Sequence, residues 1–208
     1  MKKLLLGGLL ILANFASSQV RLQFEETKFG IIAGPDVSRV RNAHNPSSAR
    51  YAFYFGALAE IPLDYNNQFF IQPQLEYLAA GEKGAGSTVY ANNYISVPIF
   101  VKGYFSSAED EFFAILGPRF GFLINQKVGS APKLSYIKDL KGKAAGFDFA
   151  IAGGLGFSVK RKLEFVLRYD FGLSSAFPDL IEPETGDPNT FRKKSQQIAS
   201  FGVSYIFK

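Results

Sequence analysis

The 208-residue chain contains no cysteine, no tryptophan and only one histidine. Without cysteine there are no disulfide bonds, no thiolate metal sites, no cysteine nucleophile and no lipid-modified N-terminal cysteine. The chain also lacks a long apolar run beyond its first residues, which excludes a bundle of membrane-spanning helices. Because one histidine and scattered acids are poor material for a metal site, we expect neither a metal nor a cofactor.

The N-terminus has the three regions of a secretory signal peptide. Two lysines follow the first methionine, residues 4–12 form an apolar stretch, and residues 16–18 form a small-residue cleavage site. The apolar stretch is well short of the roughly 20 residues that span a bilayer, so a retained anchor is the weaker alternative. We therefore expect residues 1–18 to be cleaved and residues 19–208 to form one domain outside the cytoplasm.

From residue 28 onward, the apolar residues recur with a period of two, which is the period of a β-strand. In the clearest segment, residues 163–173, the odd positions are Leu, Phe or Tyr, whereas the even positions include Glu164, Arg168 and Asp170. The pattern predicts an all-β chain with strands at about 28–37, 51–63, 69–80, 94–105, 111–125, 146–160, 163–175 and 196–208.

One face of each predicted strand is apolar and the other carries the charge. No residue on the apolar face is charged in any of the eight strands. The predicted strands exceed the usual five or six residues of soluble proteins and match the roughly 9–11 residues of a tilted membrane strand. Their apolar faces are also too large and too rich in Phe to fit inside one eight-stranded barrel. We therefore expect the apolar faces to meet lipid and polar residues to line the interior.

The connections between the predicted strands alternate in length. Short connections are expected at 64–68, 106–110 and 161–162, and longer ones at 38–50, 81–93, 126–145 and 176–195. Short turns on one side and long loops on the other are typical of outer-membrane barrels, whose loops face outward. We therefore predict an eight-stranded antiparallel up-and-down transmembrane β-barrel in the cell outer membrane, with both termini on the periplasmic side. A secreted lipocalin-like barrel with an apolar ligand cavity is the soluble alternative.

Five stretches of the chain are similar to a known family. They are FGIIAGPDVS at residues 29–38, FGALAEIPL at 55–63, FFIQPQLEYLAAGEKG at 69–84, YISVPIFVKGYF at 94–105 and FGVSYIF at 201–207. On these stretches the chain resembles the PorT-like outer-membrane β-barrel family of Gram-negative bacteria, and the fourth stretch, with Tyr94, Pro98 and Lys102, is the most specific. The resemblance implies an eight-stranded barrel, outer-membrane residence and, for the best-studied member, a part in type IX protein secretion. We expect a structural or protein-interaction module of the cell envelope, linked to secretion by this resemblance only.

The last predicted strand has the alternation that the barrel-assembly machinery usually recognises. Its apolar positions are Phe201, Val203, Tyr205 and Phe207, but Lys208 follows the aromatic residue that normally ends such a chain. The pattern favours an assembly signal shifted by one residue. A lipid-facing last strand with no signalling role is the alternative.

The interior of an eight-stranded barrel is just wide enough for side chains. Five acids are expected to face three bases there: Glu60, Glu76, Asp148, Glu164 and Asp170 against Lys102, Arg119 and Arg168. Because an isolated buried charge is very costly, these groups must pair or bond to water, which predicts a plugged lumen. A narrow ion or small-ligand conduit, with a proton or ion relay through these groups, is the alternative.

The predicted loop 126–145 is strongly basic. It holds Lys127, Lys133, Lys138, Lys141 and Lys143 against a single acid, Asp139. At an outer surface such a loop could contact lipopolysaccharide phosphates, or it could be a solvated loop that lysines keep soluble. Outer-membrane lipid is the other expected partner, and we expect no nucleic-acid partner.

The chain has few residues that could form a catalytic site. The only histidine, His44, falls in a predicted surface loop with Arg39, Arg41 and Arg50. A histidine-based triad needs a serine and a carboxylate placed around that residue, and nothing in the neighbouring sequence indicates such placement. We therefore expect no enzymatic activity.

Overall fold

The computed structural model describes residues 22–44, 46–84, 88–130, 143–178, 180 and 192–207. The predicted signal peptide, Lys208 and three lysines of the predicted basic loop, Lys133, Lys138 and Lys141, lie outside these residues. Within the part of the chain that the structure describes, no helix has the length and apolar character that a membrane crossing requires.

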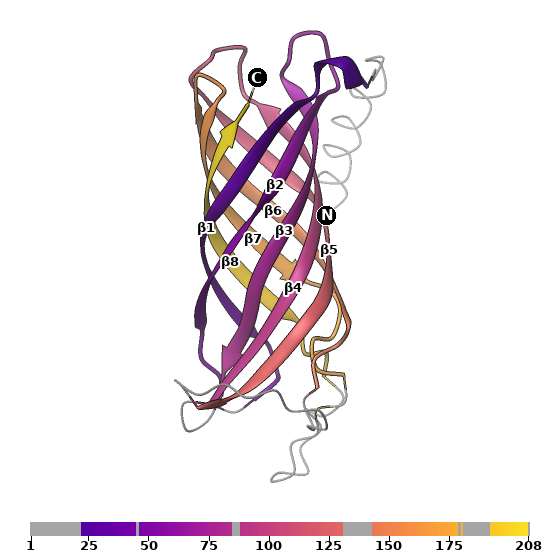
Figure 1. Ribbon diagram of the computed structural model, residues 1–208, viewed down its shortest axis with the longest axis vertical. Coiled ribbons are helices and arrows are strands. Elements are labelled where there is room, and N and C mark those ends of the chain that lie inside the picture. The colour runs from indigo at the N-terminus through magenta and orange to yellow at the C-terminus, as the bar shows by residue number, and fades with distance from the viewer. Residues whose placement is uncertain are drawn as a thin grey trace, which may run out of the picture.

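Eight antiparallel strands close into one barrel, in which each strand pairs with its sequence neighbours and β8 pairs with β1 (Figure 1). The order is η1 (Phe24–Glu26), β1 (Lys28–Val40), β2 (Arg50–Pro62), β3 (Phe69–Lys83), β4 (Thr88–Tyr104), β5 (Glu111–Ser130), β6 (Phe147–Val159), β7 (Leu163–Gly172) and β8 (Gln196–Ile206). The predicted fold class, an eight-stranded antiparallel up-and-down barrel, is therefore confirmed.

The two ends of the barrel differ, as Figure 1 shows. The start of β1 and the end of β8 lie at one end, together with the connections 63–68, 105–110 and 160–162, and we call this the short-turn end. The described parts of three longer connections, residues 41–44 and 46–49, 143–146, and 173–178 with 192–195, lie at the opposite, long-loop end.

The predicted long connection at 81–93 is wrong, because most of it is strand. Residues 81–83 of β3 pair with residues 89–91 of β4, which leaves only residues 84–87 between the two strands. The ladder here extends past the apolar band of the barrel, where Glu82, Asn92 and Asn93 replace the alternating pattern. The alternation reports contact with lipid, and the hydrogen bonds of a strand continue beyond it.

A β-bulge interrupts β5 in the same region. Asn93 pairs with Asn125, whereas the next residue, Tyr94, pairs with Leu123, so that Ile124 is an extra residue. The inward side of β5 consequently changes from odd to even positions, and Val128 is buried while Lys127 is exposed. A bulge of this kind re-aims the side chains that follow it.

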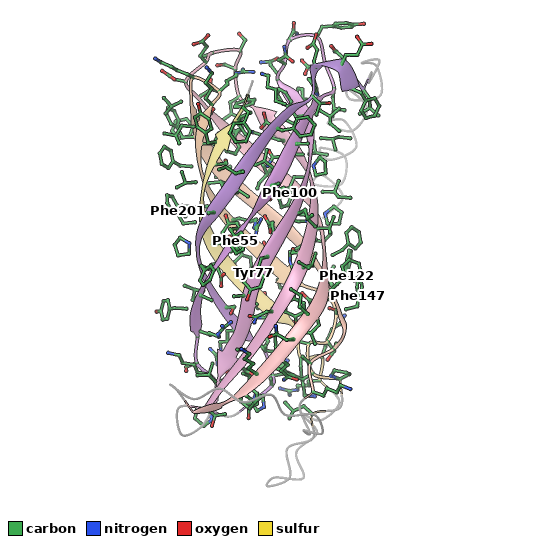
Figure 2. All side chains as sticks on the ribbon, in the orientation of Figure 1. Phe55, Tyr77, Phe100, Phe122, Phe147 and Phe201 are labelled. Atoms are coloured by element: carbon green, nitrogen blue, oxygen red, sulfur yellow. The ribbon has the colours of Figure 1, made fainter. Side chains whose placement is uncertain are left out.

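The outside of the barrel is apolar, whereas the inside combines charged and polar side chains with a buried apolar cluster that includes Phe70, Phe100 and Phe113. Leu167 is 66% exposed, whereas the next residue, Arg168, is only 3% exposed. Phe122, Phe147 and Phe201 are exposed on the outer face, and Figure 2 shows them pointing away from the barrel. An apolar surface that encircles the molecule is incompatible with water and is the surface expected of a barrel in lipid.

Placing a charge on this outer face should destabilise the barrel. Leu167 lies midway along β7, so Leu167→Arg places a guanidinium near the middle of the bilayer and should cost about 2–4 kcal/mol. The measurement is the midpoint of urea unfolding from lipid vesicles. Leu167→Phe is the matched control and should unfold close to the wild-type midpoint, and an equal midpoint for the arginine variant would contradict the lipid-facing assignment.

Candidate functional site

The charged side chains inside the barrel come from six strands and all lie on inward positions. The structure places each of the eight predicted residues there, buried from solvent: Glu60, Glu76, Lys102, Arg119, Asp148, Glu164, Arg168 and Asp170. Strand alternation determines this placement, because a side chain adjacent to an outward apolar residue must face inward. The eight residues gather into two clusters.

The first cluster is centred on Lys102 of β4. Its Nζ atom lies 2.5 Å from Glu60 Oε1 of β2 and 2.5 Å from Glu164 Oε1 of β7. The Tyr104 hydroxyl donates to the same oxygen of Glu164 at 2.6 Å. The ammonium also lies 4.3 Å from the centre of the Phe113 ring, a cation–π distance. One ammonium group therefore joins two carboxylates and an aromatic ring deep in the barrel.

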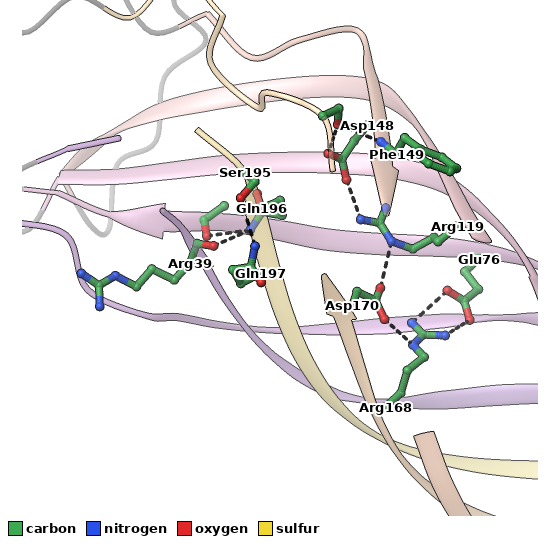
Figure 3. A network of polar contacts seen from close by, with 12 residues as sticks. Arg39, Glu76, Arg119, Asp148, Phe149, Arg168, Asp170, Ser195, Gln196 and Gln197 are labelled. Carbon is green, nitrogen blue, oxygen red and sulfur yellow. Dashed lines mark hydrogen bonds and ion pairs between the residues drawn. The ribbon is translucent and has the colours of Figure 1, made fainter. Parts of the chain in front are cut away.

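The second cluster is a chain of alternating acids and bases (Figure 3). Glu76 accepts two hydrogen bonds from Arg168, at 2.8 and 3.2 Å. Asp170 joins this arginine to Arg119, with N–O distances of 3.2 Å and 2.9 Å. Arg119 also pairs with Asp148 at 2.5 Å. Two arginines are thus neutralised by three carboxylates, and the paired, fork-like contacts match the geometry that guanidinium groups prefer.

The remaining residues of the resemblance motif lie on the same inward face of β4 as Lys102. Tyr94 and Pro98 are both buried. The motif thus marks the inner face of one strand, and Lys102 is its member in the charge network.

Asp36 of β1 is a buried charge near the second cluster that our sequence-based set left out. It is only 1% exposed, and neither carboxylate oxygen has a hydrogen-bond partner among the described residues. The signal was present in the sequence, because Asp36 lies on the inward phase of the first predicted strand. With Asp36, six carboxylates face three basic groups in this part of the interior.

One small cavity lies between the two clusters. A cavity of about 10 Å³ is lined by Gln72, Gln74, Ile115, Glu164 and Arg168, among others. That volume is at the lower limit for a single water molecule. No group of three or more acids or histidines among the described residues is placed to hold a metal ion.

An apolar cluster lies at the long-loop end. It consists of buried residues from the loops and strand ends, against which Tyr90 and Leu123 pack: Val40, Ala43, Ala144, Ala176, Phe177 and Leu180. The cluster brings residues of three loops together with the end of β1 at this end of the barrel.

His44 lies in a loop, as predicted, but its side chain is not at the surface. The side chain is 14% exposed, and its Nδ1 atom lies 2.5 Å from Glu82 Oε1. Its ring stacks on Tyr90 with 3.8 Å between ring centres. The sequence concealed this contact because Glu82 belongs to the part of β3 that we had assigned to a loop.

A serine also contacts Glu82, but the three residues do not form a catalytic triad. The Ser47 hydroxyl donates to Glu82 Oε2 at 2.5 Å, so the carboxylate lies between the serine and His44. A triad needs the histidine in the middle, where it can take the proton of the serine. The group instead ties loop 41–49 to the end of β3.

Arg161 closes the short-turn end, which sequence reasoning missed. Its guanidinium lies 4.2 Å from the centre of the Tyr104 ring. It donates to the backbone oxygens of Ala108 at 3.1 Å and Ser106 at 3.2 Å, and to that of Asn67. Three turns are thereby joined across the mouth. The only signal in the sequence was an arginine in an unusually short connection.

The closed antiparallel barrel, its apolar coat and its charged interior define an integral outer-membrane β-barrel protein. The model of the outer membrane protein beta-barrel domain family matches residues 14–178, and the chain belongs to this family. The cell outer membrane is therefore its location. A comparison with curated proteins gives no match.

Solved structures of outer-membrane proteins have a similar fold. Neisserial surface protein A is 14% identical, with a TM-score of 0.52 over 86% of this chain and 97% of that one. Ail, the attachment invasion locus protein of Yersinia pestis, is 14% identical, with a TM-score of 0.48 over 88% and 99% of the two chains. OprG from Pseudomonas aeruginosa is 14% identical, with a TM-score of 0.45 over 86% and 95%. At this level of identity the likeness concerns the fold alone.

Breaking the Lys102 cluster should destabilise the barrel. Lys102→Met leaves Glu60 and Glu164 facing each other without a cation, which should cost about 3–5 kcal/mol. The measurement is again urea unfolding from vesicles.

A compensated variant separates charge from packing. Adding Glu60→Gln and Glu164→Gln to Lys102→Met removes the uncompensated charges and should recover most of the lost stability. If this triple variant were no more stable than Lys102→Met, the cost would lie in packing and the electrostatic account would be wrong.

Proposed function

We propose that this protein is a closed outer-membrane barrel that acts as a structural or protein-interaction module and does not conduct. The observation that carries the proposal is closure at three levels. Arg161 joins the turns at the short-turn end, the ion pairs fill the middle, and Phe177 with its apolar neighbours joins three loops at the long-loop end. A pathway for ions would have to break all three.

The two alternative functions fit the described residues less well. A conduit needs connected free volume, but the cavity between the two clusters is about 10 Å³. A lipocalin-like carrier needs an open apolar cavity inside, whereas the described interior is occupied by ion pairs and by packed apolar side chains such as Phe70 and Phe100, and further apolar side chains cover the outside. We also propose that the protein has no catalytic activity, since Glu82 separates Ser47 from His44.

Conductance in planar bilayers tests closure. We expect the purified barrel to give no stable open-channel current, because its charges are paired across the lumen. Folding of the sample is checked first by heat-dependent migration on gels. A positive control is Arg161→Ala combined with Phe177→Ala, which loosens both mouths and should raise the frequency of transient openings. Stable single-channel conductance of the wild type would overturn the proposal.

The resemblance to PorT-like barrels extends this proposal to protein secretion. With no conduit inside, a role in type IX secretion would be that of a membrane partner for other secretion components and not that of the channel. The surfaces available for such contacts are the turns at the short-turn end and the described loop residues at the opposite end (Figure 1).

Deleting the gene and purifying the tagged barrel test this extension. We expect the secreted proteome to lose a set of cargo proteins, and the tagged barrel to retain secretion components through washing. A tagged outer-membrane barrel of similar size is the control for non-specific capture. An unchanged secreted proteome would end the secretion hypothesis, even if another stable partner were found.

Two further contacts belong to the proposal. Phe201, Val203, Tyr205 and Phe207 are all exposed on the outer face of the barrel, as a strand recognised by the assembly machinery requires. The predicted contact of segment 126–145 with lipopolysaccharide rests on exposed Lys127 and Lys143, of which Lys127 lies on the end of β5 and not in a loop. Both contacts stay predictions.

A further inference from the structure

The exposed charges that the structure describes at the long-loop end are of one sign. Among the described residues, every exposed charged side chain at this end is basic: Arg39, Arg41, Lys127, Lys143, Arg192 and Lys193. The described acids near this end are buried: Glu82 pairs with His44, Asp148 pairs with Arg119, and Asp36 faces the interior. The described part of this surface therefore attracts anions.

Four of these basic residues gather where β1 meets β8, and we call them the basic rim: Arg39, Arg41, Arg192 and Lys193. The backbone N–H of Arg41 donates to Ser195 O at 2.9 Å. The Asn42 side chain donates to Lys193 O at 3.2 Å. Arg39 pairs with Gln197 in the ladder between the two strands. These bonds bring two segments that are distant in sequence to the same edge of the mouth.

An apolar groove runs down the outer face directly below the basic rim. Its volume is about 510 Å³, and its lining includes Pro35, Val37, Leu167, Tyr169, Ala199 and Phe201. Val37 lies two residues before Arg39, so both side chains share the outer face of β1. The basic rim and the apolar groove thus lie one below the other along the barrel.

Small side chains create the groove. Ala199 pairs with Val37 on one side and with Tyr169 on the other, so a methyl group lies between larger neighbours. Gly153 and Pro35 also line it. The β1–β8 ladder has no assigned pairs between Ala33–Val203 and Asp36–Ser200, next to Pro35, which has no N–H to donate.

We propose that the basic rim and this groove together bind a phosphorylated glycolipid of the outer leaflet, with a phosphate on the rim and an acyl chain in the groove. The choice of this ligand rests on which side of the membrane the site faces. The long loops of an outer-membrane barrel face outward, so rim and groove lie in the leaflet whose lipid carries phosphates at the surface. A soluble anion would use the rim alone, whereas a lipid uses both parts. This site uses other residues than the contact of segment 126–145 and rests on outer-membrane residence, not on a closed lumen.

Charge-removing variants test the rim. The probe is diphosphoryl lipid A, titrated into the full-length purified protein in detergent micelles and followed by native mass spectrometry. Arg41→Gln with Lys193→Gln should weaken binding about 30-fold, because losing one basic residue near an anionic lipid surface weakens binding roughly fivefold and this variant loses two. The matched control is Lys160→Gln with Lys162→Gln at the short-turn end, which should leave binding unchanged.

Filling the groove tests the acyl-chain part. Ala199→Leu places a larger apolar side chain in the groove and should weaken binding of lipid A about threefold, because only packing is lost where detergent already surrounds the chain. Ala57→Leu, at an exposed outward position of β2, is the control and should bind as wild type. Deacylated lipid A should bind wild type and Ala199→Leu equally weakly.

The outcomes separate this site from the contact of segment 126–145. If Lys127→Gln with Lys143→Gln weakened binding while the rim variant did not, the rim site would be wrong and the contact of segment 126–145 would be supported. If deacylated and intact lipid A bound equally well, the groove would have no part and the proposal would be overturned.

Discussion

The bilayer offers no water to the backbone, and the rest of this structure depends on that constraint. Every N–H and C=O within the apolar band must bond to another strand, so β8 has to return to β1 and no edge remains. Closure with eight strands then fixes a narrow interior. Alternation sends the apolar residues to lipid and the others inward, which inverts the usual arrangement of a soluble protein. The 66% exposure of Leu167 beside the buried Arg168 is a consequence of this inversion.

In the narrow interior, an inward charge that is not paired destabilises the barrel. Lys102 is buried among Glu60 and Glu164, and Arg119 lies between Asp148 and Asp170. Removing one partner leaves the other charge buried and unpaired, which destabilises the barrel by more than the intact pair stabilises it. The inward positions of six strands are therefore occupied by charged groups that depend on one another. Asp36 is the exception, because the described residues give it no hydrogen-bond partner.

The sequence predicted the barrel and its faces because lipid imposes a strict period of two, and it predicted which charges lie inside for the same reason. It could not predict where the strands end, because the alternation stops at the edge of the apolar band and the strands continue beyond it. Glu82 and Asn92 lie on strands that continue beyond the apolar band, so their contacts, including the pair of Glu82 with His44, were hidden. The role of Arg161 was equally hidden, because its partners are backbone oxygens of turns more than fifty residues away and no side-chain pattern records them.

The pairing of the charges also bears on how the barrel selects one register. Arg168 of β7 bonds to Glu76 of β3, Glu164 of β7 to Lys102 of β4, and Asp170 of β7 to Arg119 of β5. These pairs connect strands that are not neighbours, so they depend on the stagger of the whole barrel and not on one ladder. A slip of β7 by one residue would turn all three of its charges toward lipid. A slip by two would keep the faces but separate the partners. The hydrophobic pattern thus excludes odd slips, and the ion pairs across the lumen add a penalty for the even slips that the pattern alone would tolerate.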